Sequence, residues 1–143
     1  MAIHDTPDIF MTGVFDTLRT RLEQFTRKQY GNDYAETRAF RIILDHLRAA
    51  TFLIGDGALP SNVDAGYFVR RLIRRAIRAS RTLGITDVFT HVIAEGVISD
   101  YGETYTSLIE KKDFILATLR DEEEKFRRTL ERGEREIEKI LAS

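Results

Sequence analysis

The chain has 143 residues, of which 43% are hydrophobic and 31% charged, a composition typical of one globular domain. Its net charge of −1 means that any affinity for a polyanion must come from how the charges are distributed. The absence of cysteine excludes disulfides, cysteine zinc sites and a thiol nucleophile. Neither a signal peptide nor an apolar run of roughly 18 residues is present, so we expect a cytoplasmic protein without a membrane-spanning segment.

Helical periodicity dominates the first half of the chain. Thr6 and Pro7 have the pattern of an N-cap and a first helical residue. Apolar residues then recur at spacings of three and four: Met11, Val14, Phe15, Leu18, Leu22 and Phe25. The polar stretch 30–36 separates this helix from a second one, which ends at Gly55-Asp56-Gly57. One side of the second helix carries Phe40, Ile43, Leu47 and Ile54.

The second half predicts three more helices. The third runs from about Gly66 to Leu83 and ends at Gly84. Thr86 is placed to cap the fourth, which ends at Tyr101-Gly102. The apolar face of the fourth helix consists of Val88, Phe89, Val92, Ile93 and Val97. We expect the second and third helices to pack together through Leu47, Phe52, Leu72 and Ile73.

The C-terminal segment, from about 107 to 141, predicts one helix of roughly 50 Å. Its apolar positions follow an eleven-residue period, which implies little supercoiling: Ile115, Leu119, Phe126, Leu130, Ile137 and Leu141. We expect the first three of these to be buried better than Ile137 and Leu141. No strand-type alternation is present, so the predicted fold is all-α, a bundle of about five helices with a long C-terminal helix.

The third helix has an unusual charge pattern. At 100° per residue its apolar residues fall on one arc, and six arginines fall on the complementary arc: Arg70, Arg71, Arg74, Arg75, Arg78 and Arg81. No acidic residue lies between Ala65 and Thr86, so the local charge is +6. Because the planar guanidinium suits phosphate oxygens and stays charged, this face predicts binding to a nucleic acid backbone.

Two other interpretations of the arginine face remain open. Acidic residues elsewhere, such as the cluster 121–124, would satisfy the arginines through ion pairs. A basic amphipathic helix also suits an anionic membrane surface, although this one lies between core helices.

The loop before the third helix contains Pro60, Ser61 and Asn62. An asparagine at this position is commonly a helix cap. Its amide both donates and accepts hydrogen bonds, however, and groups of that kind read base edges once phosphate contacts have set the register. We therefore predict Ser61 and Asn62 as RNA-binding residues together with the six arginines. As a base reader, Asn62 is expected to be exposed near the start of the third helix, with its amide free of strong internal bonds.

The segments "RIILDHLRAATFLIGDGALPSN" and "GYFVRRLIRRAIR" resemble the helical tRNA-recognition region that follows the class II catalytic core of alanyl-tRNA synthetases. "HDTPDIF" (4–10) and "DEEEKFRRTLERG" (121–133) resemble flanking parts of the same family. The resemblance implies that residues 1–143 form one tRNA-recognition domain of a larger ligase, with residues 1–8 joining it to the catalytic core.

The family's function supplies specific expectations. In that family this region binds the acceptor stem of alanine tRNA, and the asparagine of the "PSN" loop recognises a G·U wobble pair from the minor groove. The resemblance assigns this role to Asn62. The chemistry fits, because the unpaired guanine N2 amino group projects into the wide, shallow minor groove of A-form RNA. The implied partners are the alanine tRNA acceptor stem and the upstream catalytic domain.

The sequence departs from the family pattern at several points. Ala65 occupies a position that is usually basic, and the family's second reader of the wobble pair, an aspartate, is expected beyond Ser143. The motifs for ATP, Mg²⁺ and alanine and the zinc ligands of the editing domain are absent from this segment. His4, His46 and His91 lack metal-ligand spacing, and His46 is expected to be a core or second-layer histidine. We expect no catalysis and no cofactor in this segment; the alternative function is a free-standing helical protein–protein interaction domain without an RNA role.

Overall fold

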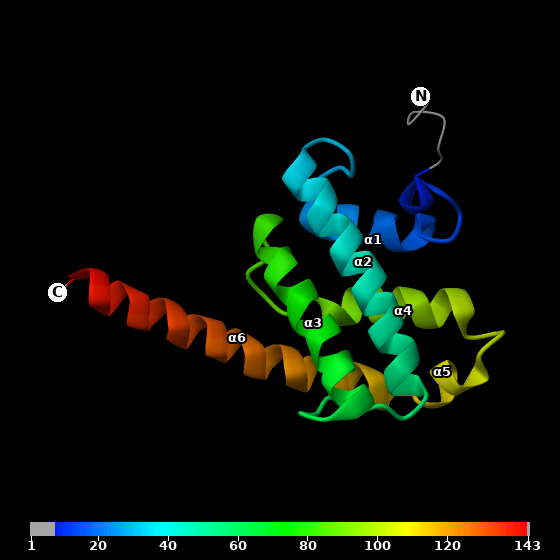
Figure 1. The fold of residues 1–143 in the computed structure, drawn as a ribbon. Helices are drawn as coiled ribbons and strands as arrows, with labels where there is room; N and C mark the ends of the chain where they lie inside the picture. The colour runs from blue at the N-terminus through cyan, green and yellow to red at the C-terminus, as the bar shows by residue number, and fades with distance from the viewer. Residues whose placement is uncertain (1–7, 143) are drawn as a thin grey trace.

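The computed structural model describes residues 8–142, and this part of the chain is all-α. After a short 3₁₀ turn at Ile9–Met11, the helices are α1 (Asp16–Thr26), α2 (Tyr34–Gly55), α3 (Asp64–Thr82), α4 (Thr90–Tyr101), α5 (Thr106–Glu110) and α6 (Lys112–Ala142). The first five lie together as a bundle, and the C-terminal part of α6 projects away from it (Figure 1). The predicted fold class is confirmed.

Helices α2 and α3 form the most extensive helix–helix contact and run side by side in opposite directions (Figure 1). The Asp33 side chain caps α2 by accepting a hydrogen bond from the Glu36 backbone N–H at 3.0 Å. The α2 residues predicted to face the core are all buried, as are Leu72 and Ile73 on α3. Phe52 is only partly buried, and its ring packs edge-on against Tyr101 and Tyr105.

Two helix starts differ from the predicted ones. The first α-helix begins at Asp16, so Met11 and Val14 lie outside it and are exposed; the expected cap at Thr6-Pro7 is outside the described residues. The fourth helix begins at Thr90, without a cap from Thr86. Its first backbone N–H groups are satisfied by a distant side chain, Glu123 of α6, which sequence periodicity does not reveal.

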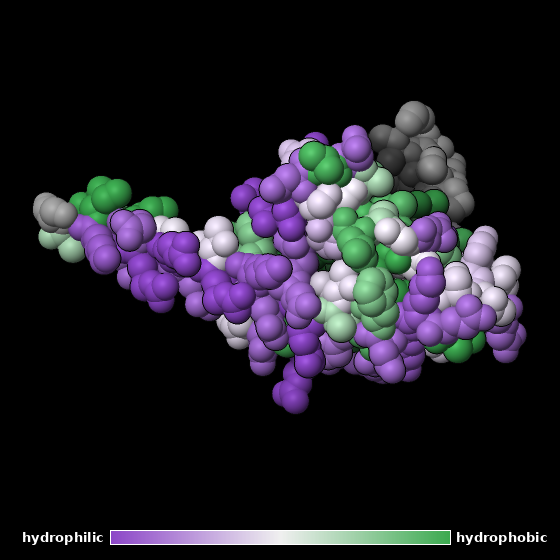
Figure 2. All heavy atoms as spheres, turned by 90° about the horizontal axis from the view of Figure 1, so that it is seen from below, coloured by the Kyte–Doolittle hydropathy of each residue, from purple (hydrophilic) through white to green (hydrophobic). Residues whose placement is uncertain are grey.

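The C-terminal segment consists of two helices instead of one. Lys111 interrupts the helical geometry, so a five-residue α5 precedes α6, whose 31 residues span roughly 45 Å. The predicted burial gradient is confirmed: Ile115, Leu119 and Phe126 are buried, whereas Ile137 and Leu141 are exposed. Residues 131–142, the arm, are exposed throughout, and apolar side chains gather near the tip (Figure 2).

Candidate nucleic-acid interface

Helix α3 separates its apolar and basic residues as predicted. Val69, Leu72, Ile73, Ala76 and Ile77 are buried in the bundle. Gly84, in a left-handed conformation with φ of +76°, ends the turn after the helix. The arginines occupy the outer side of α3, which leaves them accessible to solvent or to α6.

The six arginines fall into two groups. Arg71, Arg75 and Arg78 are exposed and form no ion pair with any of residues 8–142. The other three pair with acidic residues of α6: Arg70 and Arg74 with Glu122, and Arg81 with Glu134. Ion pairing with the 121–124 cluster, one of the open interpretations, therefore accounts for two of the six arginines.

Glu122 holds two of the paired arginines, Arg70 and Arg74, from inside the protein. Its side chain is 4% exposed, and its carboxylate accepts hydrogen bonds from Arg70 Nε at 3.3 Å and Arg74 Nε at 3.1 Å. A carboxylate buried to this extent is stable only when it is paired. Glu122 thus holds both guanidinium groups at the junction of α3 and α6.

Asn62 is connected to this ion-pair cluster. It is exposed at the mouth of α3, and its Oδ1 accepts a hydrogen bond from Arg70 Nη1 at 2.6 Å. The prediction that its amide is free of internal bonds is therefore wrong. The cap interpretation is also wrong, since Val63 is the N-cap residue and no side chain caps α3. A guanidinium only donates hydrogen bonds, so the atom facing it is the amide oxygen, and the NH₂ group remains available.

Ser61 shapes the loop that carries Asn62. Its hydroxyl donates to the Val63 carbonyl at 3.0 Å and accepts from the Val63 N–H at 3.3 Å. Gly66 allows the loop to lie against the first turn of α3, because an added Cβ would overlap Ser61 Oγ and the Leu59 carbonyl oxygen. Ser61 does not line the groove along the outer side of α3, and its contact with RNA stays a prediction.

A groove of about 390 Å³ runs along the outer side of α3. It brings together Asn62 and five of the six predicted arginines, and its remaining lining residues are Tyr67 and Phe126. Sequence reasoning did not include these two aromatic residues in the site. Tyr67 could have been found, because it precedes Arg71, Arg74 and Arg78 by four, seven and eleven residues and so shares their face. Phe126 of α6 has no such local signal.

The ring of Phe126 packs against the guanidinium groups of two of the arginines. The guanidinium carbons of Arg74 and Arg78 lie 4.9 Å and 5.4 Å from the centre of its ring. Cation–π contacts at these distances orient a guanidinium without neutralising its charge. The groove therefore combines fixed positive charge, an exposed tyrosine ring and one amide.

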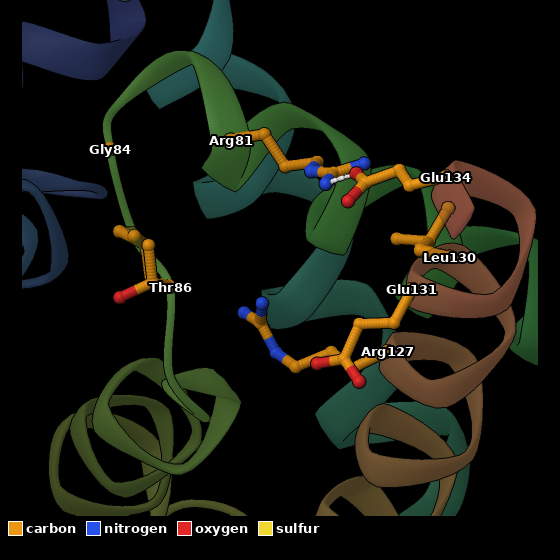
Figure 3. Close-up of a pocket in the computed structure, with 8 residues that line it drawn as sticks. Arg81, Gly84, Thr86, Arg127, Leu130, Glu131 and Glu134 are labelled. Atoms are coloured by element: carbon orange, nitrogen blue, oxygen red, sulfur yellow. Dashed lines mark ion pairs between the residues drawn. The ribbon is translucent and has the colours of Figure 1, made fainter. Parts of the chain in front are cut away.

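Arg81 lies outside this groove. It points toward Glu134 across a separate cavity of about 280 Å³ between the end of α3 and α6 (Figure 3). Arg127 and Glu131 line the same cavity, so its charges are mixed. The structure therefore separates Arg81 from the other five predicted arginines.

The His46 side chain on α2 is 12% exposed, which agrees with the expected core or second-layer position. Its Nδ1 lies 3.0 Å from Asp45 Oδ2, and its Nε2 is buried without a hydrogen-bond partner among the described residues. Burial lowers the pKa of His46 below its ordinary value, and the positive charge of Arg75 acts in the same direction, whereas Asp45 opposes the shift. Within residues 8–142, no group of three or more His, Asp or Glu side chains is placed to hold a metal ion. No helix in this range is long and apolar enough to cross a bilayer.

Comparison with known proteins places this chain in a family. The whole chain, residues 1–143, matches the sequence model of the family described as tRNA synthetases class II (A). The chain therefore belongs to this family, and the resemblance inferred from its motifs is confirmed.

Several similar proteins are alanine–tRNA ligases. The chain is 40% identical to that of Thermoanaerobacter sp. (strain X514) over 125 residues, which are 87% of this chain and 14% of the relative. It is 42% identical to that of Geobacillus thermodenitrificans (strain NG80-2) over 131 residues, or 92% and 15%. It is 39% identical to that of Bacillus mycoides (strain KBAB4) over 141 residues, or 98% and 16%. The chain thus spans between 14% and 16% of the length of these relatives.

Proposed function

We propose that this chain is the tRNA acceptor-stem recognition domain of an alanine–tRNA ligase. The observation that carries the proposal is the groove along α3, which combines the Asn62 amide with three arginines that lack an ion pair among residues 8–142. The whole of residues 1–143 belongs to this domain, and residues 1–8 join it to an upstream catalytic domain. Activation of alanine with ATP and Mg²⁺ belongs to that domain, and zinc belongs to the editing domain.

The unpaired arginines supply affinity. Arg71, Arg75 and Arg78 are exposed, so their charges are available to phosphate oxygens. Contacts of this kind set the position of an RNA duplex without reading its sequence. Arg70 and Arg74 are already paired with Glu122, so their charges contribute less to phosphate binding. Arg70 instead orients the Asn62 side chain.

Asn62 supplies discrimination between a G·U and a G·C pair. Its Oδ1 has two lone pairs, of which Arg70 uses one, so the second can accept from the free guanine N2 amino group. Its NH₂ group is available to a neighbouring 2′-hydroxyl. Because the Arg70 bond restricts rotation of the amide, the acceptor is held in place before RNA binds, which lowers the entropy cost of the contact.

The test is a binding titration of the chain against two RNA hairpins that reproduce the acceptor stem and differ only in a G·U or G·C pair. Wild-type protein should prefer the G·U hairpin. Asn62→Ala should lose roughly 1–3 kcal/mol against the G·U hairpin and much less against the G·C hairpin. Equal losses for both hairpins, measured also in a full-length ligase, would rule out the assignment of Asn62.

A protein–protein interaction domain without an RNA role is the second candidate. Two observations favour it: α6 neutralises three of the six arginines, and the arm exposes Ile137, Ile140 and Leu141. The same titration separates the candidates, since binding through phosphates weakens steeply with salt. Absence of salt-dependent RNA binding would favour the interaction domain.

A further inference from the structure

A second basic cavity lies between α2 and α3, away from Asn62. It has a volume of about 290 Å³ and is formed by the N-terminal half of α2 and the C-terminal half of α3. Its lining residues are Ala35, Arg38, Ala39, Ile42, Arg75, Arg78, Ala79 and Thr82. Three of these are arginines and none is acidic.

The three arginines of this cleft have no internal counter-charge. Arg38, Arg75 and Arg78 are exposed, and none forms an ion pair with any of residues 8–142. The acidic residues nearest to Arg38 along α2 have other partners: Glu36 pairs with Lys28 at 2.6 Å, and Asp45 lies against His46. Bringing three positive charges to one cavity costs free energy through repulsion, and a bound anion would remove that cost.

The shape of the cleft also suits a phosphate. The alanines leave room next to the two helices, and the arginines approach from both sides of the cavity, two from α3 and one from α2. A guanidinium binds two phosphate oxygens at once, and Thr82 adds a hydroxyl donor. This arrangement differs from the mixed-charge cavity beside Arg81, where two glutamates are among the lining residues.

We propose that the α2–α3 cleft binds a backbone phosphate of the same RNA, with Arg38 as a phosphate ligand contributed by α2. The inference rests on the proposed function, because Arg75 and Arg78 line both the groove and the cleft and so connect the two. Arg78 lies about 10 Å along α3 from Arg71, so the phosphate in the cleft belongs to a more distant nucleotide of the bound strand. Since phosphates are alike in every sequence, the cleft adds affinity without selectivity.

The experiment compares Arg38→Ala with Arg128→Ala in the full chain. Arg128 is an exposed arginine on α6 opposite its buried face, so its replacement removes the same charge away from both cavities. Binding of the G·U and G·C hairpins is measured over a range of KCl concentrations. Arg38→Ala should reduce the slope of log K against log salt by up to roughly 0.9, which is on the order of a tenfold loss at 0.1 M relative to 1 M. The loss should be equal for the two hairpins, Arg128→Ala should change nothing, and Arg38→Lys should keep most of the slope.

Three results would overturn the proposal. If Arg38→Ala behaves like Arg128→Ala while Arg71→Ala still lowers the slope, the RNA follows the groove but does not enter the cleft. If Arg38→Ala leaves the RNA slope unchanged but abolishes saturable binding of inorganic phosphate, the ligand is a free anion. If wild-type protein shows no salt-dependent RNA binding, the proposed function and the cleft assignment both fail.

Discussion

Replacing Glu122 with glutamine should weaken the contact that holds Arg70, and through Arg70 the position of the Asn62 amide. The carboxylate lies at 3.2 Å from Arg70 Nη2 and 3.1 Å from Arg74 Nε, and Arg70 in turn holds Asn62 Oδ1 at 2.6 Å. In Glu122→Gln one oxygen can still accept a hydrogen bond, but the new NH₂ group faces a guanidinium, donor against donor. The buried negative charge that neutralises both arginines is lost.

The magnitude follows from the exposure of the partners. Breaking a fully buried ion pair costs about 3–5 kcal/mol, because a charge is left without compensation. Here the arginine side chains are 20% and 40% exposed, so both guanidinium groups can turn toward water. One or two hydrogen bonds to a charged group are weakened, each contributing about 1.5–3 kcal/mol. We expect Glu122→Gln to lower the free energy of unfolding by about 2 kcal/mol, measured by urea denaturation.

Glu123→Gln is the matched control. Glu123 is the adjacent residue and equally buried, but its carboxylate accepts from the backbone N–H groups of Phe89 and Thr90 at 3.0–3.2 Å and from Arg127. It should therefore reduce stability to a similar extent without disturbing Asn62. In hairpin titrations, Glu122→Gln should reduce the preference for G·U over G·C, and Glu123→Gln should retain it. The reasoning is refuted if both variants lose the preference equally, or if Glu122→Gln keeps it in full.

Three further predictions concern charge, pH and loop packing. Arg71→Ala should lower the slope of log K against log salt for RNA binding by up to roughly 0.9. Arg81→Ala should change this slope less, because Arg81 is paired with Glu134 outside the groove. The same slope in both variants would contradict the division of the arginines into two groups. Because burial lowers the pKa of His46, the unfolded chain binds more protons than the folded one below about pH 6.5. The free energy of unfolding should therefore fall as the pH drops through that value. Thermal melts of His46→Gln at pH 5–7 should show a weaker dependence on pH. Gly66→Ala should destabilise the protein by about 1–3 kcal/mol, since the added methyl overlaps the preceding loop; an unchanged melting temperature would show that the loop moves freely.

Local sequence was sufficient for the features that depend on helical geometry. A period of 3.6 residues determines which side chains share a face, so the buried arc of α3, its arginine arc and the core face of α2 followed from spacing alone. The burial gradient along α6 followed from its interrupted apolar stripe, and the end of α3 followed from Gly84. The family was recognisable in the same way, because its motifs are contiguous segments of the chain.

The tertiary structure decided how the charges are partnered. Glu122 and Glu123 are consecutive and chemically identical, but they point about 100° apart around α6. That rotation directs one carboxylate to the arginines of α3 and the other to the N-terminus of α4. No local pattern specifies how α6 is rotated against its neighbours.

The sequence therefore predicted most of the residues of the candidate site, but only part of their arrangement in space. Asn62 and five of the arginines meet in one groove, whereas Arg81 is paired elsewhere and Ser61 bonds its own loop. Phe126 and Arg38 reach their cavities only because distant helices pack beside α3. The sequence determined which faces are apolar and which are charged, since these depend on residues a few positions apart. Which charge remains free for a ligand depended on packing between helices far apart in the chain, and only the folded structure contains that information.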